Sequence, residues 1–350
     1  MRVTISDVAL RAGVSKSTVS NYINARYEKM SDSTKQAISN AMRELEYIPN
    51  VSAQRLANKT KSRTICLIIP RNMVRIFDSL YYPTVFRAIE KAAAKRHYRI
   101  LLYPMSGIRD DDFKYLNGIS SSLIDGYIVF DLSEDNLFFR DFESKNIPYI
   151  CVGKIWNVDD YNFVASDHQK AIEDSIKYLR QLHHEKIGFV TLKEKDDSVV
   201  SKVRDKGILE ICSEQRIPPE NIIRYDHKYQ VRNADDETLL HMWEEIFNDE
   251  TATAFIITSS VRPMMLLAAQ KCGLHVPDDF SYINIEYYQR SPLDETVQTR
   301  VESRAKEVAE IAFEELRKKI NSEEERKKRT NILIPLYLTI GDTTAFNPKA

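Results

Sequence analysis

The sequence predicts an N-terminal all-α helix-turn-helix head followed by a two-lobed α/β core. Three observations support this division. The first 50 residues contain short capped helix patterns with one apolar face each. From Thr64 onward, apolar runs of strand length alternate with amphipathic helices, which is typical of parallel sheets covered on both faces. With 350 residues, 43% of them hydrophobic, the chain can bury more than one ordinary domain core.

Two short helices begin the head. Thr4 can cap the first helix together with Asp7, and Gly13 can adopt the positive φ that ends it. Ser15 can cap a second helix immediately afterwards. Two helices joined by so short a link must cross steeply, as in a helix-turn-helix.

The second helix has a polar outer face. Val19 and Ile23 face inward, and the outward residues are Lys16, Ser17, Ser20, Asn21 and Asn24. Their amide, hydroxyl and ammonium groups suit base edges and phosphates. A third helix, opened by Ser31, closes the small core and stops before Pro49.

A helical fragment and a linker follow the head. Residues 50–57 have a helical sequence but are too short to be stable alone in water, where about 12 to 15 residues are marginal. We expect them to become ordered only against a partner. Residues 58–63 are polar and basic, as in a linker.

The order of these segments resembles the head and hinge of the lactose/galactose repressor family. The segments that carry the resemblance are Val3–Ala9, Ala12–Ser20 and Tyr47–Ala57. It implies a homodimer on palindromic double-stranded operator DNA, with Lys16, Ser17 and Asn21 reading the major groove. It also implies that paired hinge helices enter the minor groove, with Leu56 as a wedge. The candidate DNA-binding residues are Thr4, Ser15, Lys16, Ser17, Thr18, Ser20, Asn21, Asn24, Asn50, Ala53 and Leu56.

Asn21 departs from the family pattern, which usually has arginine at this position. Arginine favours guanine and asparagine favours adenine, so we expect a different operator base there. The alternative is that Asn21 contacts only phosphate.

Charge is divided unequally along the chain. Residues 1–63 hold eleven lysines and arginines against five acids, a net charge of +6, so the remainder carries −7 of the total of −1. A basic head on an acidic body concentrates attraction for phosphate in one region.

The core sequence repeats the strand and helix alternation twice. The first set is strands at 65–69, 99–103, 126–130 and 149–152 with helices at 85–95, near 110–122 and at 135–144. The second is helices at 168–181, 200–215, 235–248 and 261–272 with strands at 186–190, near 221–225, and at 254–257 and 280–285. A long helix at 302–320, an exposed charged turn at 321–329 and a last strand at 332–338 complete the chain.

The core also resembles the periplasmic-binding-protein-like (type I) core of the same repressors. Its landmarks are Ile124–Gly126, Ile147–Pro148, Ser166–His168, Arg204–Gly207, Gly273–Asp279 and Pro292–Leu293. The resemblance implies two lobes joined by three crossovers, with a small effector between them. The predicted domains are the head at 1–49, the hinge helix and linker at 50–63, the N-terminal lobe at 64–165 plus about 296–325, and the C-terminal lobe at 166–292 plus about 330–345.

Effector residues are expected in loops that follow strands, because ligands of open α/β sheets lie beyond the carboxyl ends of the strands. The candidates are Tyr81, Tyr82, Arg204 and Glu286. A guanidinium or a carboxylate can bind two sugar hydroxyls, and tyrosine rings can stack on a sugar. Structural roles are the alternative: packing for the tyrosines and solvent exposure for the charged pair.

Two family acceptor sites are altered. Thr258-Ser259 stands where the family has Asn-Asp, and Gly153 stands where it has Asp. Ligand identity therefore does not carry over. A sugar or sugar phosphate is the first expectation, with a nucleoside or another small polar ligand as the alternative.

Other functions have little support. The chain has nine glycines and no phosphate-binding glycine loop or nucleophile elbow, so we expect no enzyme activity, catalytic residue or cofactor. Four scattered cysteines are expected in the core, and His168, His183 and His184 lack metal-ligand spacing. No signal region or membrane span is apparent, which indicates a cytoplasmic protein.

The sequence leaves alternatives open. The effector can act as inducer or corepressor, and the partner can be a protein or a non-sugar corepressor. A solute-binding protein shares the two-lobed core, although the head and the missing signal peptide disfavour it. Only twelve residues follow Leu338, so we expect a dimer and not a tetramer.

Overall fold

The computed structural model describes most of the head and core. The described residues are 3–28, 30–47, 61–70, 81–105, 123–130, 139–155, 158, 160–190, 199–214, 216–225, 235–249, 251–287 and 296–350. Within these ranges, the side chains of residues 70, 105, 139, 199–205, 286 and 287 lie outside the description. The chain divides into a head unit and a core unit, with the division between Ser62 and Arg63, and each unit is described by itself.

The head is a three-helix unit. Its helices are α1 (Ile5–Ala12), α2 (Lys16–Ile23) and α3 (Asp32–Glu44). Val8, Val19 and Ile38, one from each helix, are fully buried against one another. The ion pair between Arg11 and Glu44, at 2.6 Å, further connects α1 to α3. The predicted helix-turn-helix head is confirmed.

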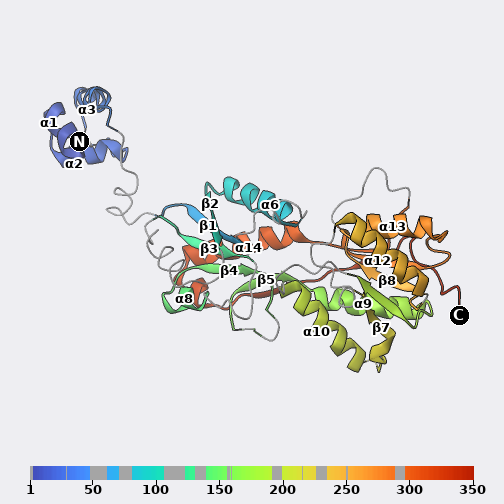
Figure 1. The fold of residues 1–350 in the computed structure, drawn as a ribbon. Coiled ribbons are helices and arrows are strands. Elements are labelled where there is room, and N and C mark those ends of the chain that lie inside the picture. The colour runs from blue at the N-terminus through green and yellow to red at the C-terminus, as the bar shows by residue number, and fades with distance from the viewer. Residues whose placement is uncertain are drawn as a thin grey trace. The chain divides into compact units, whose positions relative to one another are not determined.

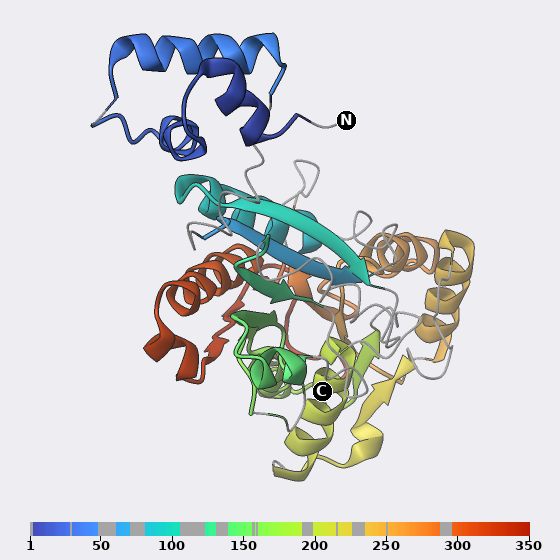
Figure 2. The same ribbon diagram turned by 90° about the vertical axis from the view of Figure 1, so that its left-hand side faces the viewer.

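The N-terminal lobe contains a six-stranded parallel sheet in the order β11-β5-β4-β3-β1-β2 (Figure 1). Its strands are β1 (Thr64–Pro70), β2 (Arg99–Met105), β3 (Gly126–Val129), β4 (Tyr149–Val152), β5 (Phe163–Ser166) and β11 (Asn331–Ile334). β1 and β2 run side by side, with β2 at the edge of the sheet (Figure 2). β3 and β4 are fully buried, as expected for central strands of a parallel sheet covered on both faces.

Helices cover both faces of this sheet. On one face α6 (Tyr81–Lys95) packs against α14 (Ala305–Asn321), and the two share an aliphatic core with β1, β3 and β4. On the other face α8 (Phe139–Ser144) places Phe142 against Tyr127, with ring centroids 4.6 Å apart.

The C-terminal lobe contains a second six-stranded sheet in the order β12-β10-β9-β8-β6-β7. Its strands are β6 (Ile187–Val190), β7 (Ile222–Arg224), β8 (Ala254–Ile257), β9 (Ser281–Tyr287), β10 (Arg300–Glu302) and β12 (Leu338–Thr339). All pairs are parallel except β10 with β12. One face packs on α9 (His168–Gln181) and α10 (Val199–Glu214), and the other on α12 (Asp236–Asp249) and α13 (Arg262–Lys271).

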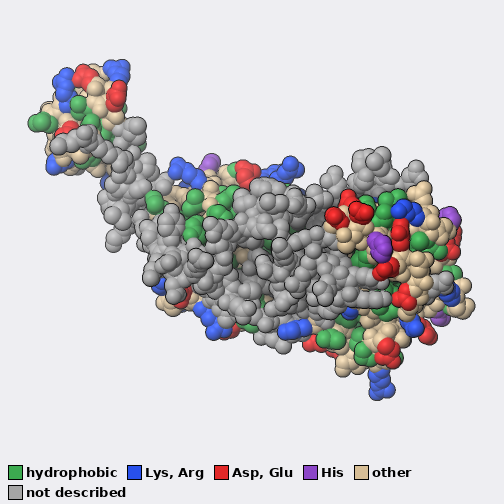
Figure 3. All heavy atoms as spheres, in the orientation of Figure 1, with side chains coloured by type: hydrophobic (Ala, Val, Ile, Leu, Met, Phe, Trp, Pro, Cys, Tyr) green, Lys and Arg blue, Asp and Glu red, His purple; other side chains and the backbone are tan. Residues whose placement is uncertain are grey.

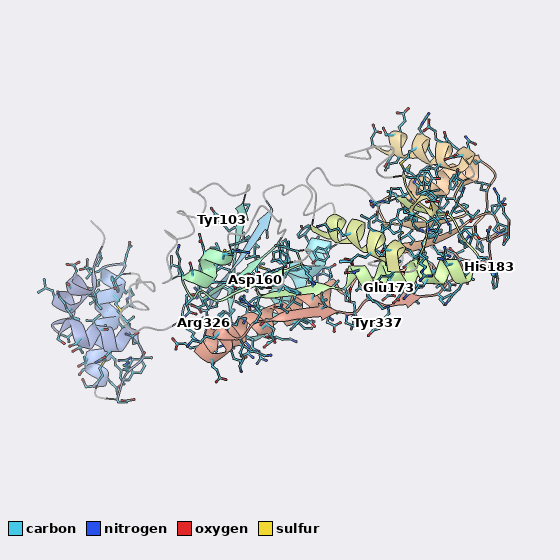
Figure 4. The ribbon with its side chains drawn as sticks, turned by 90° about the horizontal axis from the view of Figure 1, so that it is seen from below. Tyr103, Asp160, Glu173, His183, Arg326 and Tyr337 are labelled. Carbon is cyan, nitrogen blue, oxygen red and sulfur yellow. The ribbon has the colours of Figure 1, made fainter. Side chains whose placement is uncertain are left out.

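Three segments connect the lobes, as the resemblance implies. They follow β5, β10 and β11, and they are bonded to one another. The amide of Asp167 donates to the carbonyl oxygen of Ile334 at 2.9 Å. The guanidinium of Arg304 donates to the carbonyl oxygen of Pro335 at 3.4 Å and lies over the ring of Tyr337, which is labelled in Figure 4. The crossovers therefore form one bonded group.

Two lobe boundaries differ from the sequence prediction. The predicted last strand at 332–338 is two strands: β11 extends the N-terminal sheet and β12 extends the C-terminal sheet. Pro335 separates them because proline cannot donate to a ladder. β10 pairs with β9, although the predicted bounds placed residues from about 296 in the N-terminal lobe. Partner backbones, and not local sequence, decide which sheet such short strands join.

The charged tract at 321–329 is another correction, because it is not simply an exposed turn. It contains the short helix α15 (Glu323–Lys327). The side chain of Lys319, which is only 2% exposed, is hydrogen-bonded to this segment. The ammonium group of Lys319 donates to the carbonyl oxygens of Glu325 and Lys328. Arg326, labelled in Figure 4, donates back to the carbonyl oxygen of Lys319 at 3.2 Å. Burial lowers the pKa of Lys319.

Some smaller expectations changed as well. β5 and β10 were not predicted, because four- and three-residue strands give little periodic signal. Cys272 is exposed, whereas the other three cysteines are buried as expected. The predicted helix near 110–122 lies outside the described residues.

Candidate DNA interface and effector site

Thr4 and Asp7 build the start of α1. The amide and hydroxyl of Thr4 both donate to one carboxylate oxygen of Asp7, at 2.8 and 2.7 Å. These bonds lower the pKa of Asp7. At the other end Gly13 has a φ of +68°, which allows the chain to turn directly into α2. The predicted capping box and glycine stop are both present.

Ser15 caps α2 as predicted. Its hydroxyl oxygen accepts from the amide of Thr18 at 3.1 Å, and it lies 2.7 Å from the hydroxyls of Ser17 and Thr18. At the far end the side-chain amide of Asn24 donates to the carbonyl oxygen of Ser20 at 2.7 Å. These polar groups therefore already serve the helix itself.

Lys16, Ser17 and Asn21 are exposed on α2, while Val19 is fully buried. Because α2 turns about 100° per residue, these three side chains point away from the head core. They offer one ammonium, one hydroxyl and one amide to a neighbouring surface. Thr4 is exposed too, whereas Thr18, Ser20 and Asn24 are half-buried. Lys16 and Asn21 are thus outward residues only, whereas Ser17 is exposed and its hydroxyl also lies 2.7 Å from that of the capping Ser15.

The hinge candidates cannot be placed. Asn50, Ala53 and Leu56 lie outside the described residues.

Tyr81 and Tyr82 form the first turn of α6 and do not precede it as a loop. Their rings meet edge to face with centroids 5.4 Å apart, and Tyr82 also contacts Phe86 and Phe130. Burial raises the pKa of Tyr81. Both tyrosines are half-buried against the lobe core, at the side where Phe130 follows the end of β3. The two tyrosines therefore pack on the lobe core and lie near the carboxyl ends of its strands, where an effector is expected.

Arg204 and Glu286 are placed by their backbones alone. Arg204 lies in α10 and Glu286 near the end of β9, and both side chains lie outside the description. The nearby Gly207 serves helix packing: a Cβ there would lie 3.2 Å from the side chain of Gln169 on α9. Ile208 is buried in the lobe core.

A polar network missed by the sequence analysis lies at the carboxyl end of β8. The side-chain amide of Asn284 donates to the hydroxyl of Ser259 at 3.0 Å and to the side-chain oxygen of Gln298 at 3.1 Å. Asn284 and Gln298 are 1% and 4% exposed. The signal was visible as one asparagine inside the apolar run at 281–285. Thr258 and Ser259 therefore place two neutral hydroxyls where the family has an amide and a carboxylate, and the hydroxyl of Ser259 is bonded to this network.

Gly153 is held in a tight loop after β4. The hydroxyl of the buried Tyr161 accepts from the amide of Ile155 at 2.6 Å and donates to the carbonyl oxygen of Gly153 at 3.3 Å. Gly153 has a φ of +114°, which an aspartate would rarely adopt. The residue that replaces the family carboxylate here therefore has a backbone conformation that suits glycine.

The surface of the core is acidic over α12, whereas the only charged residues of α13 are the basic Arg262 and Lys271. Figure 3 shows acidic and histidine side chains on this surface, where α12 carries Asp236, Glu237, Glu244, Glu245 and Asp249. Such a surface repels phosphate.

Among the described residues, no cluster of His, Cys, Asp and Glu could hold a metal ion. None of the helices in those ranges has the length and apolarity of a membrane span.

Comparison with known proteins agrees with both parts of the fold. The model of bacterial regulatory proteins of the lacI family matches residues 4–50, and the periplasmic binding protein-like domain matches residues 176–344. Catabolite control protein A of Priestia megaterium is 28% identical, over 92% of this chain and 94% of its own. The transcriptional repressor PurR of Vibrio atlanticus is 24% identical, over 93% of this chain and 94% of its own.

Solved structures show the same fold. The lac repressor dimer bound to operator and the anti-inducer ONPF superposes with a TM-score of 0.75 at 20% identity, covering 99% of this chain and 100% of that one. The complex of the transcriptional regulator CelR with cellobiose gives a TM-score of 0.62 at 19% identity, covering 98% and 100%.

Proposed function

Because this chain belongs to the lacI family of bacterial regulatory proteins, we propose that it represses a carbohydrate-utilisation operon under the control of a small sugar-like effector. The coarse assignment, a DNA-binding transcriptional regulator, follows from the family. The operon, the repressor role and the effector are the proposed part. Such a regulator acts in the cytoplasm, where operator DNA lies.

The exposed face of α2 is the observation that carries the proposal. Lys16, Ser17 and Asn21 point outward, and the caps of α2 leave these three free of the head core. Lys16 suits a phosphate or guanine, and Asn21 can bond adenine through two hydrogen bonds. The proposed operator is a palindrome in which each half-site presents an adenine to Asn21.

The dimer is part of the same proposal. β2 is an edge strand that exposes Leu101 and Leu102, at 37% and 46%. Among the described strands, none pairs with the outer edge of β2, and an open apolar edge favours association with another chain. We assign a second copy of this chain as its partner, because a palindromic operator needs two heads related by a twofold axis. The similar lac repressor structure is likewise a dimer bound to operator.

The effector is proposed to bind at the carboxyl ends of the strands, between the lobes. Tyr81 and Tyr82 stand at that side of the N-terminal lobe, and Ser259 with Asn284 stand at that side of the C-terminal lobe. Arg204 and Glu286 remain candidates from the sequence. Hydroxyl and amide groups suit a neutral polyol, and the arginine can add recognition of a phosphate or carboxylate.

A binding-site selection tests the DNA part. The full chain is used to select duplexes from a random pool, and the expected product is a palindromic consensus with strong salt dependence of binding. Recovery of duplexes without a common motif, with equal affinity for all of them, contradicts the proposal.

A thermal-shift screen tests the effector part. Monosaccharides, disaccharides and their phosphate esters are added to the full chain, and a ligand at 100 times its Kd stabilises the fold by about 2.7 kcal/mol. Operator affinity with and without a stabilising sugar then distinguishes induction from corepression. If no sugar shifts the melting temperature, a protein or non-sugar corepressor becomes the better account.

A further inference from the structure

Arg63 begins the core unit with an unusual backbone conformation. Its φ is +50°, in the left-handed region that residues other than glycine, asparagine and aspartate adopt rarely. Arg63 is also the last residue of the predicted linker. A left-handed residue at this point changes the direction in which the chain enters the sheet, so the contacts that hold it matter.

Hydrogen bonds hold Arg63 on both sides. Its amide donates to the carboxylate of Asp125 at 2.7 Å, and its carbonyl oxygen accepts from the amide of Arg99 at 2.7 Å. The amide of Asp125 in turn donates to the carbonyl oxygen of Thr64 at 2.8 Å. Only the bond to the Asp125 carboxylate comes from a side chain, so it is the one that a substitution can remove.

Asp125 and the aromatic cluster of Tyr82, Phe86 and Phe130 lie at opposite ends of the short strand β3. It immediately precedes β3, whose four residues are fully buried, and Phe130 immediately follows β3. The ring of Phe130 lies 6.3 Å from that of Tyr82 and 5.7 Å from that of Phe86, between centroids. One central strand therefore joins the entry point of the linker to the edge where the effector is proposed to bind.

We propose that Asp125 is a positioning residue for DNA binding: its carboxylate selects the left-handed backbone of Arg63 and so fixes the direction in which the hinge segment meets the core. The inference rests on the proposed function, because it assumes that operator binding needs the hinge in one direction. It adds a specific residue, outside the head and the effector edge, on which that direction depends.

Removal of the Asp125 carboxylate should lower operator affinity by an amount that depends on how strongly arginine disfavours the left-handed conformation. Without the carboxylate, a left-handed arginine is disfavoured so that only a minority of molecules keep the competent direction. Operator affinity should then fall by on the order of 5- to 30-fold. Glycine adopts positive and negative φ about equally, so glycine at position 63 should limit the loss to about twofold.

Four variants of the full chain test the proposal: Asp125→Ala, Arg63→Gly, the double variant, and Asp141→Ala as a control. Asp141 is an exposed aspartate on α8 of the same lobe. The first readout is the Kd for the duplex selected by the wild-type chain. Asp125→Ala should weaken binding on the order of 5- to 30-fold, and the double variant should recover to within about twofold of Arg63→Gly. The control should match the wild type.

Amide hydrogen exchange in the peptide spanning residues 61–67 gives a second readout that needs no DNA. Exchange at position 63 should be faster in both variants that lack the carboxylate, even where operator affinity has recovered. Equal Kd values for Asp125→Ala and wild type overturn the proposal, and so does a loss that glycine at 63 fails to rescue. If the wild-type chain selects no duplex, the proposed function fails. In that case the exchange experiment still tests the second claim. If the amide of residue 63 exchanges equally fast in Asp125→Ala and in the wild type, the Asp125 carboxylate does not hold the backbone of Arg63.

Discussion

The imidazole of His184 lies 3.0 Å from the carbonyl oxygen of Ala345, 161 positions later in the chain. A carbonyl can only accept, so Nε2 donates to Ala345 and Nδ1 accepts from the hydroxyl of Thr253, 2.9 Å away. Neutral histidine satisfies both bonds while fully buried. It thereby anchors the C-terminal segment, whose Ala345 amide also donates to the hydroxyl of Ser281 at 3.0 Å.

The first prediction concerns acid stability. Burial lowers the pKa of His184, so the unfolded chain takes up this proton before the folded chain does. The contribution of His184 is complete above the unfolded value of about 6.5 and is lost as the pH falls toward the lowered folded value. Urea unfolding at pH 7.5 and 5.5 should show a smaller pH-dependent loss for His184→Gln than for the wild type. His241→Gln, at an exposed position, should behave as the wild type. An equal loss in His184→Gln contradicts the assignment.

The second prediction concerns the buried amide pair. Asn284→Leu leaves the side-chain oxygen of Gln298 without this donor and should destabilise the protein by about 1 to 3 kcal/mol. Replacing both residues by leucine should destabilise by less than the sum of the single variants. Additive losses in urea unfolding would mean that the two amides do not interact.

The third prediction concerns the cap of α2. Ser15→Ala should lower head stability by about 1 kcal/mol, because the amide of Thr18 loses its acceptor. Ser15→Asp should restore the cap but weaken operator binding, since a negative charge approaches the DNA phosphates. Hydrogen exchange within α2 reports the first effect, and the operator Kd reports the second. Equal operator affinity for serine and aspartate would place Ser15 away from the phosphates.

The fourth prediction concerns base preference. Asn21→Arg should move the preferred base at one position of each half-site from adenine to guanine, because a guanidinium bonds the two acceptors of guanine. Ser33→Arg adds the same charge at an exposed position of α3 and should leave the consensus unchanged. Binding-site selection with each variant compares them. If Asn21→Ala keeps the wild-type preference at every position, Asn21 contacts only phosphate.

The fifth prediction concerns the dimer. Leu102→Glu places a charge on the exposed edge strand and should shift the sedimentation mass from two chains toward one at micromolar concentration. Leu267→Glu, at a similarly exposed leucine on α13, should leave the mass unchanged. A wild-type mass of four chains contradicts the expected dimer.

The helical head could be predicted from its residues alone, because its signals are local. Thr4, Ser15 and Ser31 cap helices within three residues of themselves, and Gly13 adopts a left-handed turn that needs no distant partner. Most of the longer core elements were also predictable, because their apolar runs and helical periodicity are local, whereas the short strands β5 and β10 gave too little periodic signal. The family resemblance then supplied the arrangement of those elements.

Contacts between distant segments could be known only from the folded structure. The assignment of β10, β11 and β12 to their sheets, the bond from Arg63 to Asp125, and the buried network of Asn284 and Gln298 all join residues whose separation carries no periodic signal. Lys319 shows the same limit. A lysine in an amphipathic helix is normally solvated, and this one is buried because two carbonyl oxygens accept hydrogen bonds from its ammonium group. Local sequence sets which elements form, and the pairing of polar groups across the fold sets where they meet.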